Sequence, residues 1–153
     1  CEMCIRDRDR KRIRYVSVTV WRDNQLDALE AVMKRETLDF IQVNYAIDNR
    51  AAAERVIPLA ADRGVAVMTT VPFGRDRLFK AVQGKELPAF AKDLGCASWP
   101  QVFLKYVLGN PAVTCPIPGM AKAAYVEDNL GAARGKLPDA AQRKQMEMFI
   151  DAV

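Results

Sequence analysis

Residues 38–70 have the sequence LDFIQVNYAIDNRAAAERVIPLAADRGVAVMTT. This stretch begins with an apolar, β-branched run, Leu38–Tyr45, and ends with another, Val65–Thr70, and both runs predict strands. Between them, Asn49–Arg63 carries alanine, valine and isoleucine at helical spacing, and Gly64 is placed to end the predicted helix. A strand, a helix and a second strand form the unit of a parallel sheet with right-handed crossovers.

The alternation continues on both sides of this unit. Ile13–Val20 and Ala112–Ile117 are further β-branched runs and predict two more strands. Helical spacing of apolar residues predicts helices at Gln25–Arg35, Trp99–Leu108, Tyr125–Ala133 and Pro138–Val153, with short helices around Leu78 and Phe90 in the connection Val71–Ala97. Strands that alternate with helices in this way predict a parallel sheet with helices packed outside it.

Four strand–helix units are half of a (β/α)8 barrel of the TIM type, which needs about 250 residues. The 153 residues therefore predict an α/β half-barrel of four parallel strands with outer helices, in a single domain over residues 1–153. A small open α/β sheet is the alternative. No glycine-rich phosphate loop follows its first strand, which argues against a Rossmann-type nucleotide site in such a sheet.

The composition is that of an ordinary water-soluble domain, with 50% hydrophobic and 27% charged residues. We expect no membrane partner, because no apolar run approaches the roughly 18 residues of a spanning helix. We expect no leader peptide, because the charged N-terminus contains no apolar segment. We also expect no nucleic-acid partner, because the net charge is only +4 and the basic N-terminal residues are interleaved with Asp7 and Asp9.

The cysteines and the absence of histidine bear on metal binding. Cys1 and Cys4 form a CxxC pair, but no second pair follows, and Cys96 and Cys115 stand alone in a chain with no histidine. We therefore expect ordinary thiols in a reducing, cytoplasmic environment and no metal site. The chain also lacks the commonest general acid–base residue.

Five segments have an order and spacing that occur together in one enzyme family. They are Ile13–Thr19, Leu38–Tyr45, Gly64–Met68 with Pro72–Gly74, Ser98–Leu108, and Val113–Met120 with Asp128–Leu130. The five resemble, in turn, the fifth strand, the sixth strand, the seventh strand with its loop, the seventh helix, and the eighth strand with the cofactor loop of the aldo/keto reductase family. The resemblance extends from about residue 10 to about residue 145.

The resemblance implies an oxidoreductase that binds a nicotinamide cofactor, usually NADP(H), at the C-terminal mouth of a barrel and reduces carbonyl groups to alcohols. The family's catalytic tetrad of Asp, Tyr, Lys and His lies on the first four strands, to which nothing in this chain corresponds. Residues 1–12 are similar to the end of the fourth helix, and residues 138–153 form the C-terminal helix. We therefore expect no catalytic residue, part of the cofactor groove, and no carbonyl reduction by the chain alone.

The resemblance also implies which residues line that groove on the strand side. Thr19 and Gln42 match positions that hold the nicotinamide carboxamide, although Val20 stands where the family has an amide. The loop near the pyrophosphate is matched by Pro72, Phe73 and Gly74.

Beyond the eighth strand, a helix begins whose N–H groups and dipole suit a phosphate. The cofactor residues expected there are Pro118, Gly119, Met120, Lys122, Asp128 and Asn129, with Asp128 and Asn129 in the place of a pair that contacts adenine and Lys122 as the only cation nearby. The family often has Lys, Ser and Arg where this chain has Gly119, Met120 and Tyr125. These departures put selectivity for NADP(H) over NAD(H) in question.

Three functions follow as alternatives. The first is a piece of an aldo/keto reductase whose activity belongs to the whole barrel, with a complementing N-terminal half as its partner. The second is a self-associating half-barrel, a homo-oligomer that binds a nucleotide or a protein without catalysis. The third is a half-barrel enzyme with a different site, in which Tyr45 acts as the acid beside Asp48.

A half-barrel leaves two strand edges and one face of its sheet uncovered. The edges are Ile13–Val20 and Ala112–Ile117, and such edges are rarely left open in proteins. We expect an exposed apolar patch on the inner face, formed by Val16, Val18, Val67 and Val113 or by their alternating neighbours. The chain is therefore expected not to be a free monomer.

Overall fold

The computed structural model describes residues 2–153, so Cys1, and with it the CxxC pair, lies outside the described residues. Four parallel strands form one sheet in the order β1-β2-β3-β4. Their bounds are Ser17–Thr19 for β1, Phe40–Asn44 for β2, Ala66–Thr70 for β3 and Cys115–Ile117 for β4. The predicted parallel sheet in sequence order is confirmed, although each strand is shorter than the apolar run that predicted it.

The helices lie between and after these strands. Their bounds are Glu2–Asp9 for α1, Leu26–Arg35 for α2, Val56–Asp62 for α3, Arg77–Ala81 for α4, Ala89–Asp93 for α5, Trp99–Leu108 for α6, Ala123–Gly131 for α7 and Ala140–Asp151 for α8. The helix α6 has the predicted bounds because Ser98 caps it, accepting a hydrogen bond from the N–H of Gln101 at 3.4 Å, and Pro100 occupies its first turn.

One predicted helix was wrong in its extent. The segment Asn49–Arg63 is not one helix but a 3-10 turn at Ala51–Ala53 followed by α3. Pro58 lies in the first turn of α3 and has no N–H to donate to the preceding turn, so a helix continuous through it would lose a hydrogen bond. Gly64 ends α3 in a left-handed conformation with φ of 66°, as expected.

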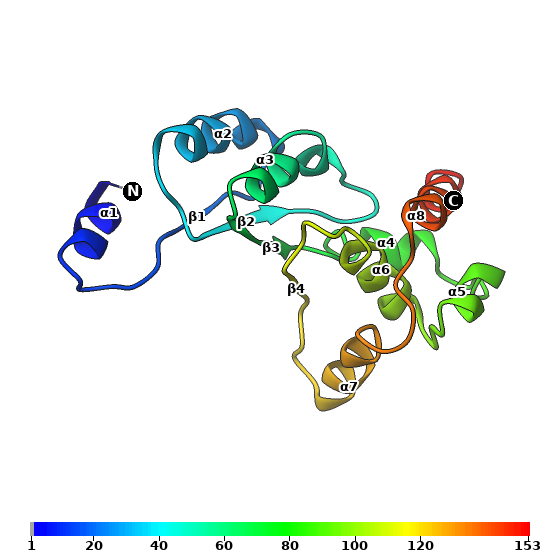
Figure 1. Ribbon diagram of the computed structural model, residues 1–153. Coiled ribbons are helices and arrows are strands. Elements are labelled where there is room, and N and C mark those ends of the chain that lie inside the picture. The colour runs from blue at the N-terminus through cyan, green and yellow to red at the C-terminus, as the bar shows by residue number, and fades with distance from the viewer. Residues whose placement is uncertain (1) are drawn as a thin grey trace.

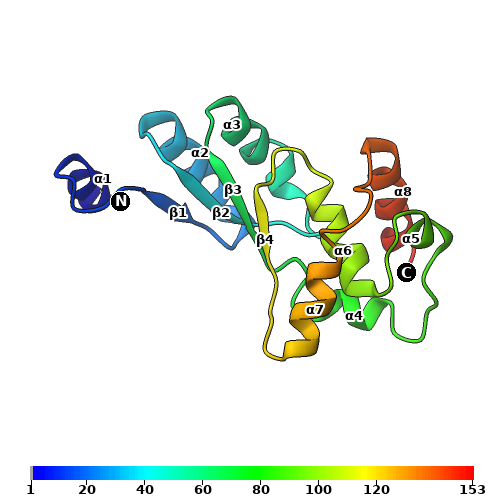
Figure 2. The same cartoon turned by 60° about the horizontal axis from the view of Figure 1, so that its bottom comes forward.

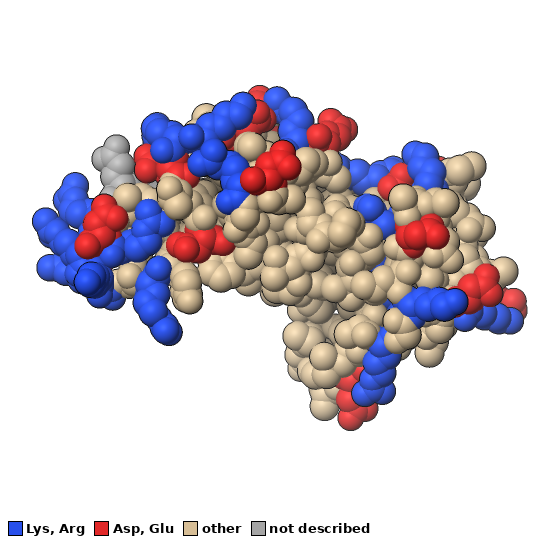
Figure 3. Space-filling view, viewed as in Figure 1, with Lys and Arg blue, Asp and Glu red and all other residues tan. Residues whose placement is uncertain are grey.

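The first helix stands apart at the β1 end of the molecule (Figure 1). Arg8 attaches it to the rest of the chain by donating to the carbonyl of Thr37 at 2.6 Å and by pairing with Asp39 at 3.6 Å. Figure 3 shows basic side chains gathered over this end of the molecule. One of them, Arg12, pairs with Asp7 at 3.6 Å, so part of this charge is neutralised within the segment.

Helices α2 and α3 cover one face of the sheet (Figures 1 and 2). Ile41, Val43 and Val67 point to that side and are fully buried. The neighbouring residues point to the opposite face, against which the figures draw no helix along β1, β2 and β3. We call this the open face; it consists of Ser17, Thr19, Phe40, Gln42, Asn44, Ala66, Met68, Thr70, Cys115 and Ile117.

The open face is formed by the second of the two expected sets, the residues that alternate with the valines. Val16 and Val67 are buried at 2% and 0% exposure, and Val18 and Val113 pack partly buried against the same core. Their alternating neighbours form the open face instead, because the register aligns Val18, Ile41 and Val67 on the side of the helices. Half of the open face is polar, so the exposed surface is less apolar than the sequence suggested.

Candidate functional site

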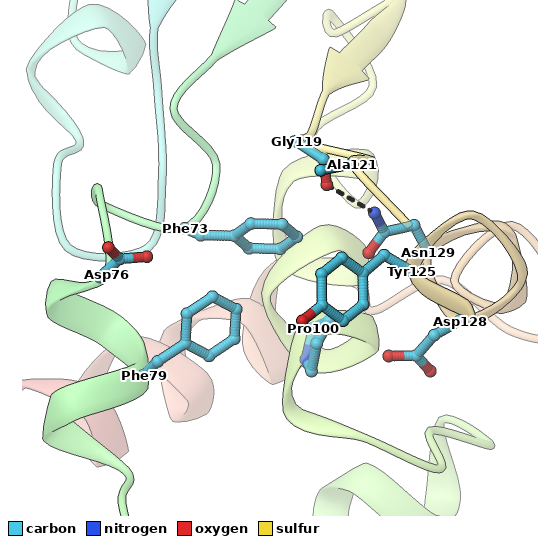
Figure 4. Close-up of a pocket in the computed structure, with 9 residues that line it drawn as sticks. All are labelled: Phe73, Asp76, Phe79, Pro100, Gly119, Ala121, Tyr125, Asp128 and Asn129. Carbon is cyan, nitrogen blue, oxygen red and sulfur yellow. Dashed lines mark hydrogen bonds between the residues drawn. The ribbon is translucent and has the colours of Figure 1, made fainter. Parts of the chain in front are cut away.

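A pocket of about 500 Å³ opens between the loops that follow β3 and β4 (Figure 4). Loops at the carboxyl ends of parallel strands are the usual place for ligand sites in α/β folds. The lining residues are Phe73, Asp76, Phe79, Pro100, Gly119, Ala121, Tyr125, Asp128 and Asn129. Four of them, Phe73, Gly119, Asp128 and Asn129, were predicted as cofactor residues from the sequence.

Aromatic rings form opposite walls of the pocket. Phe73 and Phe79 lie 5.2 Å apart between ring centroids on the side of α4, and the Tyr125 ring faces them from α7 (Figure 4). Beside Tyr125, the amide of Asn129 donates to the carbonyl of Gly119 at 3.4 Å and ties α7 to the loop after β4. The space between the walls suits a flat, largely apolar ring system.

Asp128 connects the pocket to the start of α6. Its carboxylate accepts hydrogen bonds from the Ser98 hydroxyl at 2.8 Å and from the Gln101 amide at 2.7 Å. A Cβ at Gly131 would lie 2.5 Å from that amide nitrogen, so the absence of a side chain lets α7 approach α6. Asp128 is therefore fixed in place by neutral donors and has no ion-pair partner among residues 2–153.

The other predicted residues beyond β4 lie outside this pocket. Pro118 and Met120 line a second, smaller hollow of about 190 Å³, which also reaches Asn129. Lys122 precedes α7 and is exposed, with its ammonium 5.5 Å from the centroid of the Tyr125 ring. Lys122 thus contacts a wall residue of the main pocket without lining it.

The four remaining residues that were predicted to bind the cofactor lie in two separate places, the open face and the loop after β3. Thr19 donates to the side-chain oxygen of Gln42 at 3.2 Å on the open face, and neither residue lines the pocket. Pro72 and Gly74 are buried in the loop after β3. A Cβ at Gly74, whose φ is 59°, would lie 2.5 Å from the carboxylate of Asp48, so a side chain there would displace the loop.

Sequence reasoning missed Asp76, Phe79, Pro100, Ala121 and Tyr125 as lining residues. In the sequence, Tyr125 differs from the arginine that the family often has at that position, but nothing indicates that it lines a pocket. Asp76 belongs to a loop with unusual backbone, in which Val71, Arg75 and Asp76 have φ of 56°, 51° and 69°. Left-handed backbone at non-glycine residues is uncommon and is often associated with functional loops, but no sequence pattern revealed it here.

Tyr45 and Asp48 do not form the acid–base pair considered from the sequence. Tyr45 is fully buried, and its hydroxyl accepts hydrogen bonds from Arg143 and from Asn110, the latter at 3.4 Å. Asp48 instead pairs with Arg77 at 2.9 Å. Since the tyrosine points into the core beneath α6 and α8, a substrate has no access to it.

A buried lysine holds the loop that follows α7. Lys105 on α6 has no exposed surface, and its ammonium donates to the carbonyls of Arg134 and Lys136 at 2.5 and 2.7 Å. It is a single cation within the otherwise apolar run of α6. The lysine therefore holds the segment that follows α7 against α6.

Replacing Lys105 by methionine is expected to destabilise the fold by about 2–4 kcal/mol, because the carbonyls of Arg134 and Lys136 lose their hydrogen bonds to a charged donor. Urea unfolding measures the change. The matched control is Lys92→Met on α5, whose exposed side chain makes no hydrogen bond or ion pair within the described chain. A loss below about 1 kcal/mol for Lys105→Met would contradict this role, since it is less than the value of one hydrogen bond from a charged donor.

Across residues 2–153, no three His, Cys, Asp or Glu side chains gather as metal ligands would. Cys4, Cys96 and Cys115 are free, and burial raises the pKa of the Cys96 thiol. None of the described helices has the length and apolar character needed to cross a membrane.

A sequence profile described as the Aldo/keto reductase family matches residues 9–148. An uncharacterized oxidoreductase of Schizosaccharomyces pombe is 35% identical over 80 residues, which are 52% of this chain and 25% of that protein.

Among solved structures, a thermostable aldo-keto reductase in complex with the inhibitor epalrestat superposes with a TM-score of 0.72 at 23% identity, covering 96% of this chain and 52% of that one. The holo form of an aldo-keto reductase from Bacillus halodurans gives a TM-score of 0.71 at 20% identity, covering 97% and 54%. The fold is thus four parallel strands and surrounding helices of a TIM-type α/β barrel, and the chain spans about half the length of these solved relatives.

Proposed function

The chain belongs to the aldo/keto reductase family, and from this we propose that it provides the nucleotide-binding side of a carbonyl-reducing site whose catalytic groups come from elsewhere. The observation that carries the proposal is the pocket between α4, α6 and α7, where residues distant in sequence form a slot with aromatic walls at the carboxyl ends of the strands. The proposal includes a cytoplasmic location, which free thiols favour.

The adenosine end of a nicotinamide dinucleotide fits the pocket. An adenine ring can stack between Phe73 and Tyr125, with the amide of Asn129 and the carboxylate of Asp128 at its edge to pair with ring nitrogens and the amino group. Gly119 and the first turn of α7 can face the phosphates with backbone N–H groups, since no side chain caps that helix.

The nicotinamide end is expected at the open face. Gln42 and Thr19 present an amide and a hydroxyl there, and these groups can pair with the carboxamide of the ring and orient it. The bound cofactor supplies the hydride. In this proposal the residues of the chain hold and align the cofactor, while the proton donor for the carbonyl oxygen belongs to the complementary strands.

In this proposal the chain contributes none of the catalytic groups. The sequence contains no histidine, and the tyrosines Tyr45 and Tyr106 are buried, with Tyr106 donating to Glu147 at 2.7 Å. Burial raises the pKa of the Tyr106 hydroxyl, which makes it a poorer acid. A complementing half-barrel that pairs with β1 and β4 is the partner we propose.

A second candidate function is that of a self-associating half-barrel without catalysis. The observation that favours it is the pair of unpaired edges, β1 and β4, which run parallel. Two copies related by a two-fold axis can pair β4 of each with β1 of the other. The two candidates differ in outcome: the first gives turnover together with a second, different chain, and the second assembles from copies of this chain without turnover.

The chain alone is expected to bind NADPH or NADH weakly, with a dissociation constant of about 1 mM, because half a groove offers fewer contacts and less preorganisation. Asn129→Ala and Gln42→Ala should each weaken binding by about fivefold, the value of one hydrogen bond. Ligand-detected NMR titration measures these constants.

The matched control is Gln145→Ala, an exposed position on α8 far from the groove in sequence. A dissociation constant below about 1 μM would show that the chain alone forms a complete nucleotide site, without a complementing half of the groove. Binding that neither Asn129→Ala nor Gln42→Ala weakens would place the nucleotide somewhere other than the proposed groove.

A further inference from the structure

The net positive charge of the chain lies in one short segment. Residues 6–14, which we call the basic segment, carry six basic and two acidic side chains, and their net charge of +4 is also the formal net charge of the whole chain. The rest of the chain therefore has equal numbers of basic and acidic side chains. Figure 3 shows basic side chains gathered at the end of the molecule where Figure 1 places α1.

Most cations of the basic segment are available to a partner. Arg8 pairs with Asp39, and Arg12 pairs with Asp7. The other four basic side chains are exposed and take part in no ion pair within residues 2–153; they are those of Arg6, Arg10, Lys11 and Arg14. A ligand with several negative charges would therefore find several uncompensated cations close together.

The basic segment leads directly into the outer edge of β1. On the paired side of this strand, the carbonyl of Val16 accepts from the first N–H of β2 at 3.3 Å, and the Val20 N–H donates to the carbonyl of Gln42 at 2.8 Å. Backbone groups of successive strand residues point to opposite sides, so those of Ser17 and Thr19 point away from β2. Both residues are exposed, and no strand of residues 2–153 pairs with that side of β1.

The side chains of β1 leave this edge accessible to another strand. Exposed edges are commonly blocked by a lysine, a proline or a bulge within the strand, and Ser17–Thr19 contains no lysine and no proline. The charges lie in the segment before the strand instead, with Arg14 over the exposed ring of Tyr15 at 5.7 Å. A polypeptide that pairs with β1 and continues past its amino end would therefore run beside the basic segment.

We propose that β1 and the basic segment together form a docking site for an extended, acidic segment of a partner polypeptide, which adds a strand to β1 and places its carboxylates beside Arg10 and Arg14. Backbone hydrogen bonds would supply the affinity, and the charges would supply the specificity and the rate of association. The inference rests on the proposed function only for the existence of a partner at β1, and it adds the chemistry of the strand that pairs there.

A polypeptide fits this site better than a nucleic acid does. The Ser17 and Thr19 backbone groups alternate in the way that the N–H and C=O groups of another strand can match, whereas a sugar–phosphate chain has no such donors. In addition, Asp7 and Asp9 stand among the cations of the basic segment and would repel phosphates.

The test uses two peptides of about ten residues, one that alternates glutamate with valine and one that alternates glutamine with valine. Fluorescence anisotropy of the labelled peptides measures their binding to the 153-residue chain. The acidic peptide is expected to bind about tenfold more tightly than the neutral one at about 0.05 M salt. Salt at about 0.5 M should remove most of this difference, because it screens the attraction between the charges.

Amide hydrogen exchange, followed by NMR, locates the bound peptide. The N–H groups of Ser17 and Thr19 should exchange about tenfold more slowly when the acidic peptide saturates the chain, because they gain hydrogen bonds to it. The N–H of Val20 already donates to Gln42 and should change little. This measurement distinguishes an added strand from a loose contact between charges.

A pair of double variants tests the role of the basic segment. Arg10→Gln with Arg14→Gln removes two of its exposed cations and should weaken binding of the acidic peptide about tenfold. The matched control is Lys85→Gln with Lys92→Gln, which removes two exposed cations elsewhere that form no ion pair in the described chain. The control should change the affinity by less than about twofold.

Several results would overturn the inference. They are equal affinity for the two peptides, binding that leaves Ser17 and Thr19 unprotected, and tighter binding of an oligothymidylate or of phosphatidylserine–phosphatidylcholine vesicles than of the acidic peptide at the same salt. Titration of the same sample with NADH and NADPH keeps the two proposals apart. If a nucleotide binds and the acidic peptide does not, the docking site fails while the proposed function stands; the opposite result removes the proposed function and leaves the docking site.

Discussion

The 153-residue chain, incubated with NADPH or NADH and an aldehyde, is expected to consume the cofactor no faster than buffer does. In our proposal the family's proton donor and its partners belong to the complementing half, and the loss of such groups lowers rates by about 10⁴-fold or more. Neither Tyr45 nor Tyr106 can substitute, because both are buried with their hydroxyls bonded to other side chains. The absorbance of the reduced nicotinamide measures the rate.

Adding the first half-barrel of a family member is the informative companion experiment. If the proposal is correct, the mixture regains substrate-dependent turnover, and Gln42→Ala or Asn129→Ala in this chain raises its KM for the cofactor. Steady, substrate-dependent consumption by the isolated chain that survives Tyr45→Phe would contradict our account of catalysis. Consumption that Tyr45→Phe abolishes, with the circular dichroism spectrum unchanged, would instead support the third function considered from the sequence.

In light scattering at micromolar concentration, the chain is expected to have a mass above the 17.1 kDa of one copy. Within residues 2–153, β1 and β4 each have one edge without a partner strand, and no helix covers the open face along β1, β2 and β3. Burial of its apolar residues would supply roughly 25 cal/mol per Å². Because half of that face is polar, we expect a defined assembly rather than open-ended aggregation.

Two matched substitutions test whether the open face is the contact. Ile117 lies on the open face at the β4 edge and is 39% exposed, so Ile117→Lys should shift the chain to a monomer by burying a charge in the contact. Met148 on α8 is 65% exposed and lies outside the sheet, so Met148→Lys should leave the mass unchanged. A stable monomer that binds no hydrophobic dye would show that the open face needs no partner.

The sequence by itself determined the elements and their order. The alternation of β-branched runs with helical spacing predicted four parallel strands, and local features fixed particular ends, such as Ser98 at the start of α6 and Gly64 after α3. These features are decided by hydrogen bonds and conformational preferences within a few residues. The resemblance, carried by short motifs, likewise indicated Phe73, Gly119, Asp128 and Asn129, which the fold does bring together.

Only the tertiary structure decided which way the side chains of the strands face and which residues line the pocket. Val67 and Met68 are both apolar, so β3 has no alternation that distinguishes its two faces; pairing of Ile41 with Val67 turns Val67 toward the helices. Asp76 lines the pocket with Tyr125 only because β3 and β4 are neighbours and the loop after β3 is left-handed. Long-range pairing and backbone conformation of this kind leave no periodic pattern in the sequence, so the full lining of the pocket became visible only in the folded chain.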